Sequence, residues 1–161
     1  MVLTTKYALD SGKFISDLPI DISHYLTHVE APTGSGKSTL FIEEWSKTVK
    51  IVFLCAVNVQ VAQVAADYID NPNVQCITKD TTVERLSGQV IVCVYDKLAA
   101  VQEQLNNPND YVLVIDEAHK IYQAAGYRQA ALSVIVDAIT SKTFKQVVTV
   151  SATFIPDIFP V

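Results

Sequence analysis

Hydrophobic and polar positions along the chain fall into two alternating kinds of stretch. Short runs rich in β-branched residues are typical of strands, whereas longer segments repeat apolar residues at the helical period. The expected strands are 28–30, 51–55, 74–77, 90–94, 112–115 and 147–150. The expected helices are 37–47, 59–69, 96–105 and 129–141.

Several expected strands are apolar nearly throughout, most clearly 51–55 and 112–115. Such strands suit a parallel sheet that is covered on both faces, and their alternation with helices predicts an α/β fold. We expect a three-layer sandwich with a mainly parallel sheet and right-handed crossovers. Because ligands of such sheets bind beyond the carboxyl ends of the strands, the loops that follow strands are the places to look for chemistry.

Length and composition predict a globular protein. The chain has 161 residues, of which 50% are hydrophobic and 18% are charged, and this balance indicates a single domain over 1–161 with about 1–25 as a lead-in segment. The net charge of −5 gives no overall basic surface for nucleic acid, although a local groove stays possible. No apolar run approaches the roughly 20 residues that cross a bilayer, and no signal-peptide pattern is present, so we expect a cytoplasmic protein without a membrane partner.

The cysteines indicate neither disulfides nor a metal site. Cys55, Cys76 and Cys93 are odd in number, widely spaced and set in apolar runs. This pattern fits reduced core residues. Since neither a Cys-x-x-Cys pair nor a paired histidine spacing occurs, no structural metal is expected.

A glycine-containing loop follows the first expected strand and precedes a helix. Its sequence is Ala31-Pro32-Thr33-Gly34-Ser35-Gly36-Lys37-Ser38-Thr39. In such a P-loop the backbone N–H groups surround phosphate oxygens, and the next helix adds its positive N-terminal end. Lys37 would reach the β- and γ-phosphates, and the Ser38 hydroxyl would bind Mg²⁺. The general pattern begins with Gly where this chain has Ala31; a plain Gly-Ser turn would explain the glycines but not the Lys-Ser-Thr that follows.

A second candidate site lies at the end of an apolar strand. The run 111–115 leads directly into Asp116-Glu117-Ala118-His119. Two carboxylates at the end of a buried strand are costly to ionise unless a cation meets them. Mg²⁺ held by a nucleotide supplies that charge, so Asp116 is a candidate metal partner and Glu117 a candidate base that activates the attacking water. The alternative is a strand-to-helix turn in which Asp116 caps the helix.

These motifs, with Ser151-Ala152-Thr153 after the last expected strand, resemble motifs I, II and III of superfamily 2 helicases of the DEAH type. Alanine is common at the first loop position in that superfamily. The resemblance extends from about Leu26 to Thr153 and corresponds to the first of two RecA-like domains, which have the P-loop NTPase fold. It implies that the second RecA-like domain is absent from this chain.

The resemblance also implies a role for each matching residue. The triphosphate would be bound by Thr33, Gly34, Ser35, Gly36, Lys37, Ser38 and Thr39. Ser38 and Asp116 would hold Mg²⁺, and Lys37 and Glu117 would be catalytic. His119 would couple the nucleotide state to nucleic acid through Ser151 and Thr153. The implied cofactors are ATP and Mg²⁺, and the implied partner is nucleic acid, with DNA favoured over RNA.

Two further segments stand where family members contact the nucleic-acid backbone. One is Ala56-Val57-Asn58-Val59-Gln60, in place of a Pro-Thr-Arg-like element, which makes Asn58 and Gln60 candidate contacts that lack an arginine. The adenine-recognising Gln that precedes the P-loop in DEAD-box relatives is missing, because Gln60 is the first glutamine of the chain. Base selectivity therefore stays open.

The other segment is Tyr95-Asp96-Lys97-Leu98. It resembles a Tyr-Asp-x-Leu segment of some DNA-replication helicases, so Tyr95 and Lys97 are candidate nucleic-acid contacts. The alternative interpretation is that Asp96 caps the helix that begins here.

The chain holds only two arginines, Arg85 and Arg128, and neither lies in a segment that resembles an arginine finger. Because such a finger contributes about 10³ to 10⁵ in rate, we expect slow hydrolysis and no duplex unwinding. The expected function is the ATP-binding domain of a DEAH-type helicase or translocase, which couples ATP hydrolysis to nucleic-acid remodelling. The alternatives are a nucleotide-dependent switch or partner-docking module and a small P-loop kinase, which usually needs arginines in a mobile lid.

Overall fold

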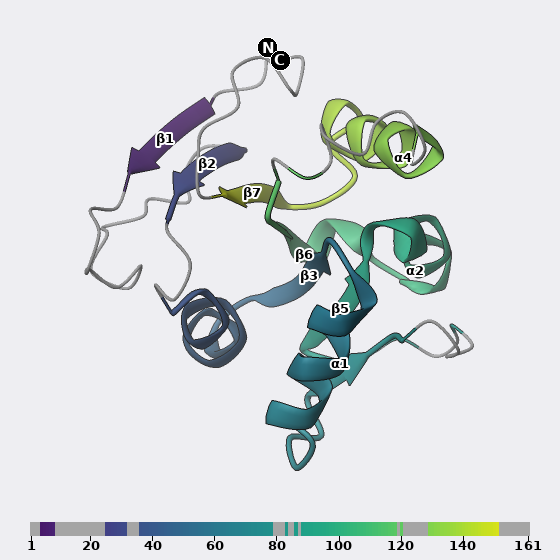
Figure 1. Cartoon of the computed structure of the whole chain (residues 1–161). Helices are drawn as coiled ribbons and strands as arrows, with labels where there is room; N and C mark the ends of the chain where they lie inside the picture. The colour runs from purple at the N-terminus through teal and green to yellow at the C-terminus, as the bar shows by residue number, and fades with distance from the viewer. Residues whose placement is uncertain are drawn as a thin grey trace.

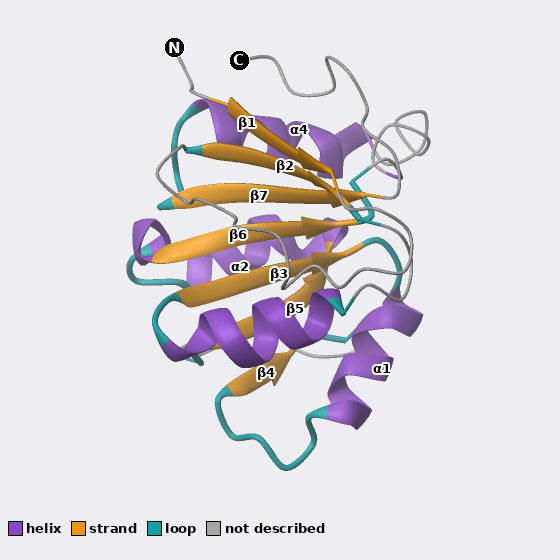
Figure 2. Ribbon diagram, turned by 90° about the vertical axis from the view of Figure 1, so that its left-hand side faces the viewer, coloured by secondary structure: helices purple, strands orange, loops and turns teal. Residues whose placement is uncertain are grey.

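The computed structural model describes residues 4–8, 25–31, 36–78, 83, 86, 88–118, 120 and 129–151. Its strands form one sheet, which Figure 1 shows roughly along the strands and Figure 2 shows face-on, with the strands lying across the picture. They are β1 (Thr4–Ala8), β2 (Leu26–Glu30), β3 (Lys50–Cys55), β4 (Val74–Cys76), β5 (Val90–Val94), β6 (Tyr111–Asp116) and β7 (Gln146–Ser151). The order across the sheet is β1-β2-β7-β6-β3-β5-β4. Every neighbouring pair is parallel, which confirms the expected α/β fold.

Helical segments connect the strands. They are the π-helical η2 (Thr39–Glu44), the 3₁₀ turns η3 (Trp45–Lys47), η4 (Tyr95–Lys97) and η5 (Pro108–Asp110), and the α-helices α1 (Asn58–Asp67), α2 (Leu98–Gln104) and α4 (Gln129–Thr140). All four expected helices are present, although the first is wound as π- and 3₁₀-helix over Thr39–Lys47. Among the helices of the described residues, none is long and apolar enough to span a membrane.

The strand β1 was not expected from the sequence, which assigned this region to a lead-in segment. Its sequence, TTKYA, includes a lysine and lacks an apolar run. It comes first in the sheet order, and among the described strands it pairs with β2 alone. Edge strands often carry a charged residue such as lysine, which discourages pairing with another chain.

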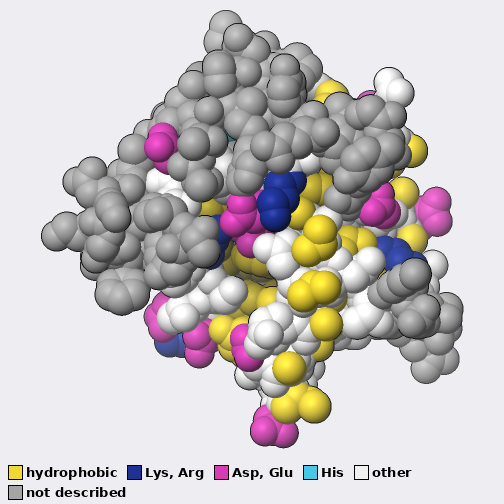
Figure 3. Space-filling view, in the orientation of Figure 1, with side chains coloured by type: hydrophobic (Ala, Val, Ile, Leu, Met, Phe, Trp, Pro, Cys, Tyr) yellow, Lys and Arg dark blue, Asp and Glu magenta, His cyan; other side chains and the backbone are white. Residues whose placement is uncertain are grey.

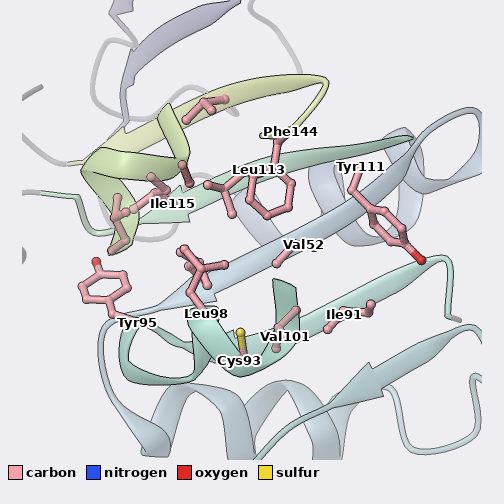
Figure 4. Packing of buried hydrophobic residues seen from close by; sticks show 14 of the residues in the cluster. Val52, Ile91, Cys93, Tyr95, Leu98, Val101, Tyr111, Leu113, Ile115 and Phe144 are labelled. Carbon is pink, nitrogen blue, oxygen red and sulfur yellow. The ribbon is translucent and has the colours of Figure 1, made fainter. Parts of the chain in front are cut away.

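Apolar side chains cover both faces of the sheet and create three layers. On one face, Phe53 and Cys55 of β3 pack with residues of η2 and α1. On the other, Val52 and Leu54 of the same strand pack with α2 and α4; Figure 4 shows part of this cluster. Successive side chains of a strand point to opposite faces, so a strand buried on both sides must be apolar at every position.

The cysteines are free thiols within these layers. Cys55 and Cys93 are buried on opposite faces of the sheet, and Cys76 is partly buried. Burial raises the pKa of Cys93 to about 12 and raises that of Cys55 as well. Thiols of this kind are unreactive at neutral pH, as core residues are.

Because all strands run in the same direction, their last residues gather at one edge of the sheet. We call this the carboxyl edge; Glu30, Cys55, Val94, Asp116 and Ser151 end their strands there. The opposite edge, where Leu26, Lys50, Tyr111 and Gln146 begin their strands, is the amino edge. The motifs expected to bind ligand all follow strands, so the fold brings them to the carboxyl edge.

Candidate functional site

The strand β7 fixes the two backbone segments that leave the sheet toward the site. It lies between β2, which leads to the glycine-containing loop, and β6, which ends at Asp116. The Ala31 N–H donates to the Ser151 carbonyl at 2.8 Å, and the Ala118 N–H donates to the Val150 carbonyl at 3.0 Å. Adjacent residues of one strand thus hold both segments, which sets the spacing between them.

The helix that follows the loop begins directly after Gly36. Gly36 has φ 81°, a left-handed conformation that favours glycine. Its carbonyl accepts the N–H of Leu40 at 3.0 Å, and Lys37 and Ser38 lie in the first helical turn. The two side chains expected to meet phosphate and Mg²⁺ therefore start the helix, where backbone N–H groups have no helical partner and attract anions.

Lys37 joins the loop to the acidic motif. Its ammonium nitrogen lies 3.0 Å from Oδ1 of Asp116 and 3.0 Å from Oε1 of Glu117. The side chains of Lys37, Asp116 and Glu117 are only 12%, 11% and 14% exposed. Residues that are 80 positions apart in the sequence thus form one buried cluster of charges.

Burial and mutual attraction act in opposite directions on this cluster. Burial disfavours the charged form of Lys37, but attraction to Asp116 and Glu117 outweighs burial and raises the pKa of Lys37. Burial also raises the pKa of Asp116, and the attraction of Lys37 offsets part of that rise. Lys37 contributes one positive charge, and Asp116 and Glu117 contribute two negative charges, so these three groups together carry an excess of negative charge when all are ionised.

That excess fits a divalent cation. Mg²⁺ is usually held by one or two carboxylates together with substrate phosphates and water. Asp116 and the nearby helix start at Ser38 offer such a small oxygen donor set. Among the described residues, no group of three or more His, Cys, Asp and Glu side chains gathers to hold a metal by protein ligands alone.

The turn after β6 has an unusual backbone. Glu117 has φ 53°, which is rare for a residue other than glycine. Its N–H donates to Oδ1 of Asp116 at 3.0 Å, and its carbonyl accepts the N–H of Lys120 at 2.9 Å. The conformation places the Glu117 side chain next to that of Asp116, so both carboxylates meet Lys37.

Several predicted site residues lie outside the described part of the chain: Thr33, Gly34, Ser35, His119 and Thr153. Of the others, Gly36, Lys37 and Ser38 are partly buried, and Thr39 is exposed. Lys37 contacts the turn formed by Asp116 and Glu117, which we call the acidic turn. Ser151 is buried and accepts the N–H of Ala31 with its carbonyl.

The two candidate contacts on α1 differ from each other. Asn58 is exposed at the first residue of the helix, beside the exposed side chains of Val57 and Val59. Gln60 turns back instead, because its Oε1 accepts the N–H groups of Ala56 at 3.1 Å and Val57 at 3.4 Å. Gln60 therefore caps the start of α1 with its amide oxygen. The contact expected from the sequence is donation to phosphate, which its amide nitrogen would make.

Tyr95 also differs from the expectation of a surface contact. Its side chain is 2% exposed and belongs to the core cluster between the sheet and α2 and α4. The hydroxyl donates to the backbone carbonyl of Asp116 at 2.5 Å and lies 2.9 Å from that of Glu117. The sequence analysis did not predict this contact. The available signal was a tyrosine directly after an apolar strand, because a buried tyrosine hydroxyl usually has a hydrogen-bond partner.

Lys97 is partly buried and follows Tyr95 by two residues at the carboxyl edge. Acidic and basic side chains are interspersed over the face shown in Figure 3, and the described residues there form no extended basic area. A nucleic-acid contact by this part of the chain would therefore depend on a few polar side chains such as Asn58 and Lys97.

Comparison with known proteins gives one family. The family model described as DEAD/DEAH box helicase matches residues 18–159, which is nearly the whole chain. A search of curated proteins finds no match.

Proposed function

Because the chain belongs to the DEAD/DEAH box helicase family, we propose that it is the ATP-binding domain of a DEAH-type helicase or translocase. Family membership implies an ATP-binding, helicase-type function. The observation that best supports the proposal is the cluster of Lys37 with Asp116 and Glu117, each carboxylate 3.0 Å from the ammonium. The sequence Asp116-Glu117-Ala118-His119 supports the DEAH type in particular.

In the proposed reaction Lys37 changes partners. Without nucleotide, its charge is compensated by Asp116 and Glu117. The phosphates of ATP are a competing anionic partner at the start of the same helix, next to Gly36 and Ser38. The transfer of Lys37 to phosphate frees the two carboxylates for other tasks.

Those tasks differ between the two carboxylates. Ser38 and Asp116 would hold Mg²⁺, and Glu117 would accept a proton from the water that attacks the γ-phosphate. When bound, Mg²⁺ supplies positive charge that stabilises the phosphate oxygens. His119, Ser151 and Thr153 would link this chemistry to nucleic acid.

The test of the proposal is the effect of Glu117→Gln on ATP turnover. Loss of the proton acceptor should lower the single-turnover rate constant of hydrolysis by about 10² to 10⁴ while ATP still binds. The matched control is Glu44→Gln, which removes an exposed carboxylate 3.3 Å from Lys47 and should leave turnover unchanged. Because the chain has only two arginines, turnover is expected to be slow, so single-turnover conditions with excess protein are needed.

Unchanged turnover in Glu117→Gln would reject hydrolysis at this site. ATP binding without turnover in the wild type would favour a nucleotide-dependent switch instead.

The nucleic-acid partner is tested by direct binding. We expect the chain to bind single-stranded DNA more tightly than RNA of the same length. Lys97→Ala should weaken DNA binding about equally for all sequences, because a lysine contact to phosphate carries no sequence information. Equal affinity for both nucleic acids would reject the preference for DNA.

A further inference from the structure

The buried hydroxyl of Tyr95 connects two strands that are not neighbours. Tyr95 begins η4 at the end of β5, and Asp116 ends β6, with β3 between them in the sheet. The ring belongs to the core cluster seen in Figure 4. From there the hydroxyl reaches past the end of β3 to the carbonyls of Asp116 and Glu117, at 2.5 Å and 2.9 Å.

The peptide unit between Asp116 and Glu117 is consequently held at both ends. Its carbonyl oxygen accepts the hydroxyl of Tyr95. Its N–H donates to Oδ1 of Asp116, the same oxygen that lies 3.0 Å from the Lys37 ammonium. The orientation of this peptide therefore determines where the Asp116 carboxylate points, and Tyr95 fixes that orientation.

The same hydroxyl supports the left-handed residue of the turn. Glu117, with φ 53°, is in a conformation that persists only where surrounding contacts hold it. Its carbonyl lies within hydrogen-bond distance of both the Tyr95 hydroxyl and the N–H of Lys120. Without the hydroxyl, fewer contacts hold the backbone of Glu117 in its left-handed conformation. A change to a more favourable φ would move the Glu117 carboxylate away from Lys37.

We infer that Tyr95 is a positioning residue for the reaction, whose hydroxyl orients the Asp116–Glu117 peptide and so aims both carboxylates. The inference rests on the proposed function. The hydrogen bond of Tyr95 also links η4 directly to the acidic turn, because Tyr95 lies in this 3₁₀ turn together with Asp96 and Lys97. A positioning residue affects the rate of the chemical step more than the binding of ATP, which the helix start around Lys37 and Ser38 is expected to provide.

Tyr111 provides a matched control. It is also a buried tyrosine of the same core cluster, and its hydroxyl donates to the carbonyl of Gly88 at 3.0 Å. It begins β6 at the amino edge, whereas Tyr95 contacts the end of that strand. Each Tyr→Phe substitution removes a buried hydroxyl that contacts backbone carbonyl oxygen. Only the Tyr95 hydroxyl makes this contact in the acidic turn.

The experiment compares Tyr95→Phe, Tyr111→Phe and wild type in the full chain. Melting temperature, kcat and KM for ATP are measured with Mg²⁺ present. Both variants should lose a similar amount of thermal stability. Tyr95→Phe should lower kcat roughly 10-fold or more with KM within about 2-fold, as loss of a group that orients a reacting side chain does. Tyr111→Phe should leave kcat unchanged. Equal kcat in the two variants would overturn the inference.

A second measurement needs no substitution. Hydrogen exchange of the Glu117 amide in the wild type should be slow, because this N–H donates to Asp116 in a peptide that Tyr95 holds. Exchange at the rate of an open loop would overturn the inference even if a variant failed to fold.

The two proposals fail in different ways. If Glu117→Gln loses turnover while Tyr95→Phe keeps the turnover of Tyr111→Phe, the role of Tyr95 is rejected and the proposed function stands. If wild type and Glu117→Gln turn over ATP at the same rate, both are rejected.

Discussion

The lysines at the carboxyl edge and at the amino edge differ in how far they are buried. At the carboxyl edge, Lys37 is nearly buried and meets two carboxylates. Near the amino edge, Lys47 pairs with Glu44 at 3.3 Å, but these side chains are 67% and 55% exposed. Lys50 lies over the ring of Tyr111 with its ammonium 5.5 Å from the ring centre. Because lysines form ion pairs at both edges, the presence of an ion pair does not tell the edge with the candidate site from the other edge.

Burial does distinguish them. An exposed ion pair is solvated, and its formation or loss changes stability little. A buried ion pair has lost the solvation of both partners, so it persists in a fold mainly where geometry or chemistry requires it. The cluster at the carboxyl edge is therefore the better indicator of function.

The largest effect expected from this comparison is the loss of stability when one buried charge is removed. Lys37→Met keeps the apolar stem and removes the ammonium that contacts Asp116 and Glu117. It should lower the free energy of unfolding by about 3 kcal/mol, the low end for a broken buried pair, because the site lies at an edge. Lys47→Met is the matched control and should cost under about 1 kcal/mol. The measurement is urea unfolding at pH 7.

A loss of the same size in both variants would contradict the comparison. Equal, small losses would mean that the two carboxylates are solvated despite their low exposure.

The next effect concerns a polar side chain that serves the fold at the carboxyl edge. Gln60→Ala removes the oxygen that accepts the N–H groups of Ala56 and Val57. It should lower the free energy of unfolding by about 1 kcal/mol, as loss of a helix cap does. Gln63→Ala, which removes an exposed hydrogen bond to Asp67 within α1, is the control and should cost less. If Gln60→Ala weakens DNA binding without any loss of stability, its role is at the nucleic-acid contact instead.

A smaller effect is expected for a cation at the amino edge. Lys50→Ala removes an exposed ammonium from the face of the Tyr111 ring. It should lower the free energy of unfolding by about 0.5 to 1 kcal/mol and leave ATP turnover unchanged. A change in turnover would show that the amino edge takes part in the chemistry.

The smallest effect at neutral pH is expected for Tyr25 at the amino edge, because its contribution to stability changes only at alkaline pH. Burial raises the pKa of Tyr25 from 10.0 to about 12, and a backbone hydrogen bond opposes part of that rise. A group whose pKa is higher in the folded state adds stability that is fully present below its unfolded pKa and is lost as the pH rises through the folded pKa. The stability that Tyr25 adds should therefore be lost between pH 10 and about 12.

Tyr25→Phe isolates this contribution, because the other tyrosines titrate alike in both proteins. The stability difference between wild type and Tyr25→Phe, measured by urea unfolding, should shift against the wild type as the pH rises above 10. A difference that stays constant from pH 8 to pH 11 would contradict the raised pKa.

Much of the fold could be predicted because most strands are buried on both faces. The expected strand 112–115 is the middle of β6 (Tyr111–Asp116), and 51–55 matches β3 (Lys50–Cys55) to within one residue. The edge strand β1 (Thr4–Ala8) escaped prediction because its sequence, TTKYA, has no apolar run that would mark it as a strand. Its place in the sheet comes from pairing with β2, which the local pattern does not reveal.

The candidate site, like the fold, has parts that the sequence predicted and parts that it did not. The motifs around Lys37 and Asp116 were visible because glycines and charged residues stand out after apolar strands. The contact of Tyr95 with the acidic turn was not visible, since it depends on the order β6-β3-β5 across the sheet. The capping bonds of Gln60 were not visible either, because they depend on the backbone geometry at Ala56 and Val57.

The most direct test of the proposed site is the affinity for ATP with Mg²⁺, measured by calorimetry on wild type, Lys37→Met and Lys47→Met. Loss of a charged contact to phosphate should weaken binding about 10- to 100-fold in Lys37→Met. Lys47→Met should bind as the wild type does. Equal affinity of wild type and Lys37→Met would contradict the placement of the ATP site at the carboxyl edge.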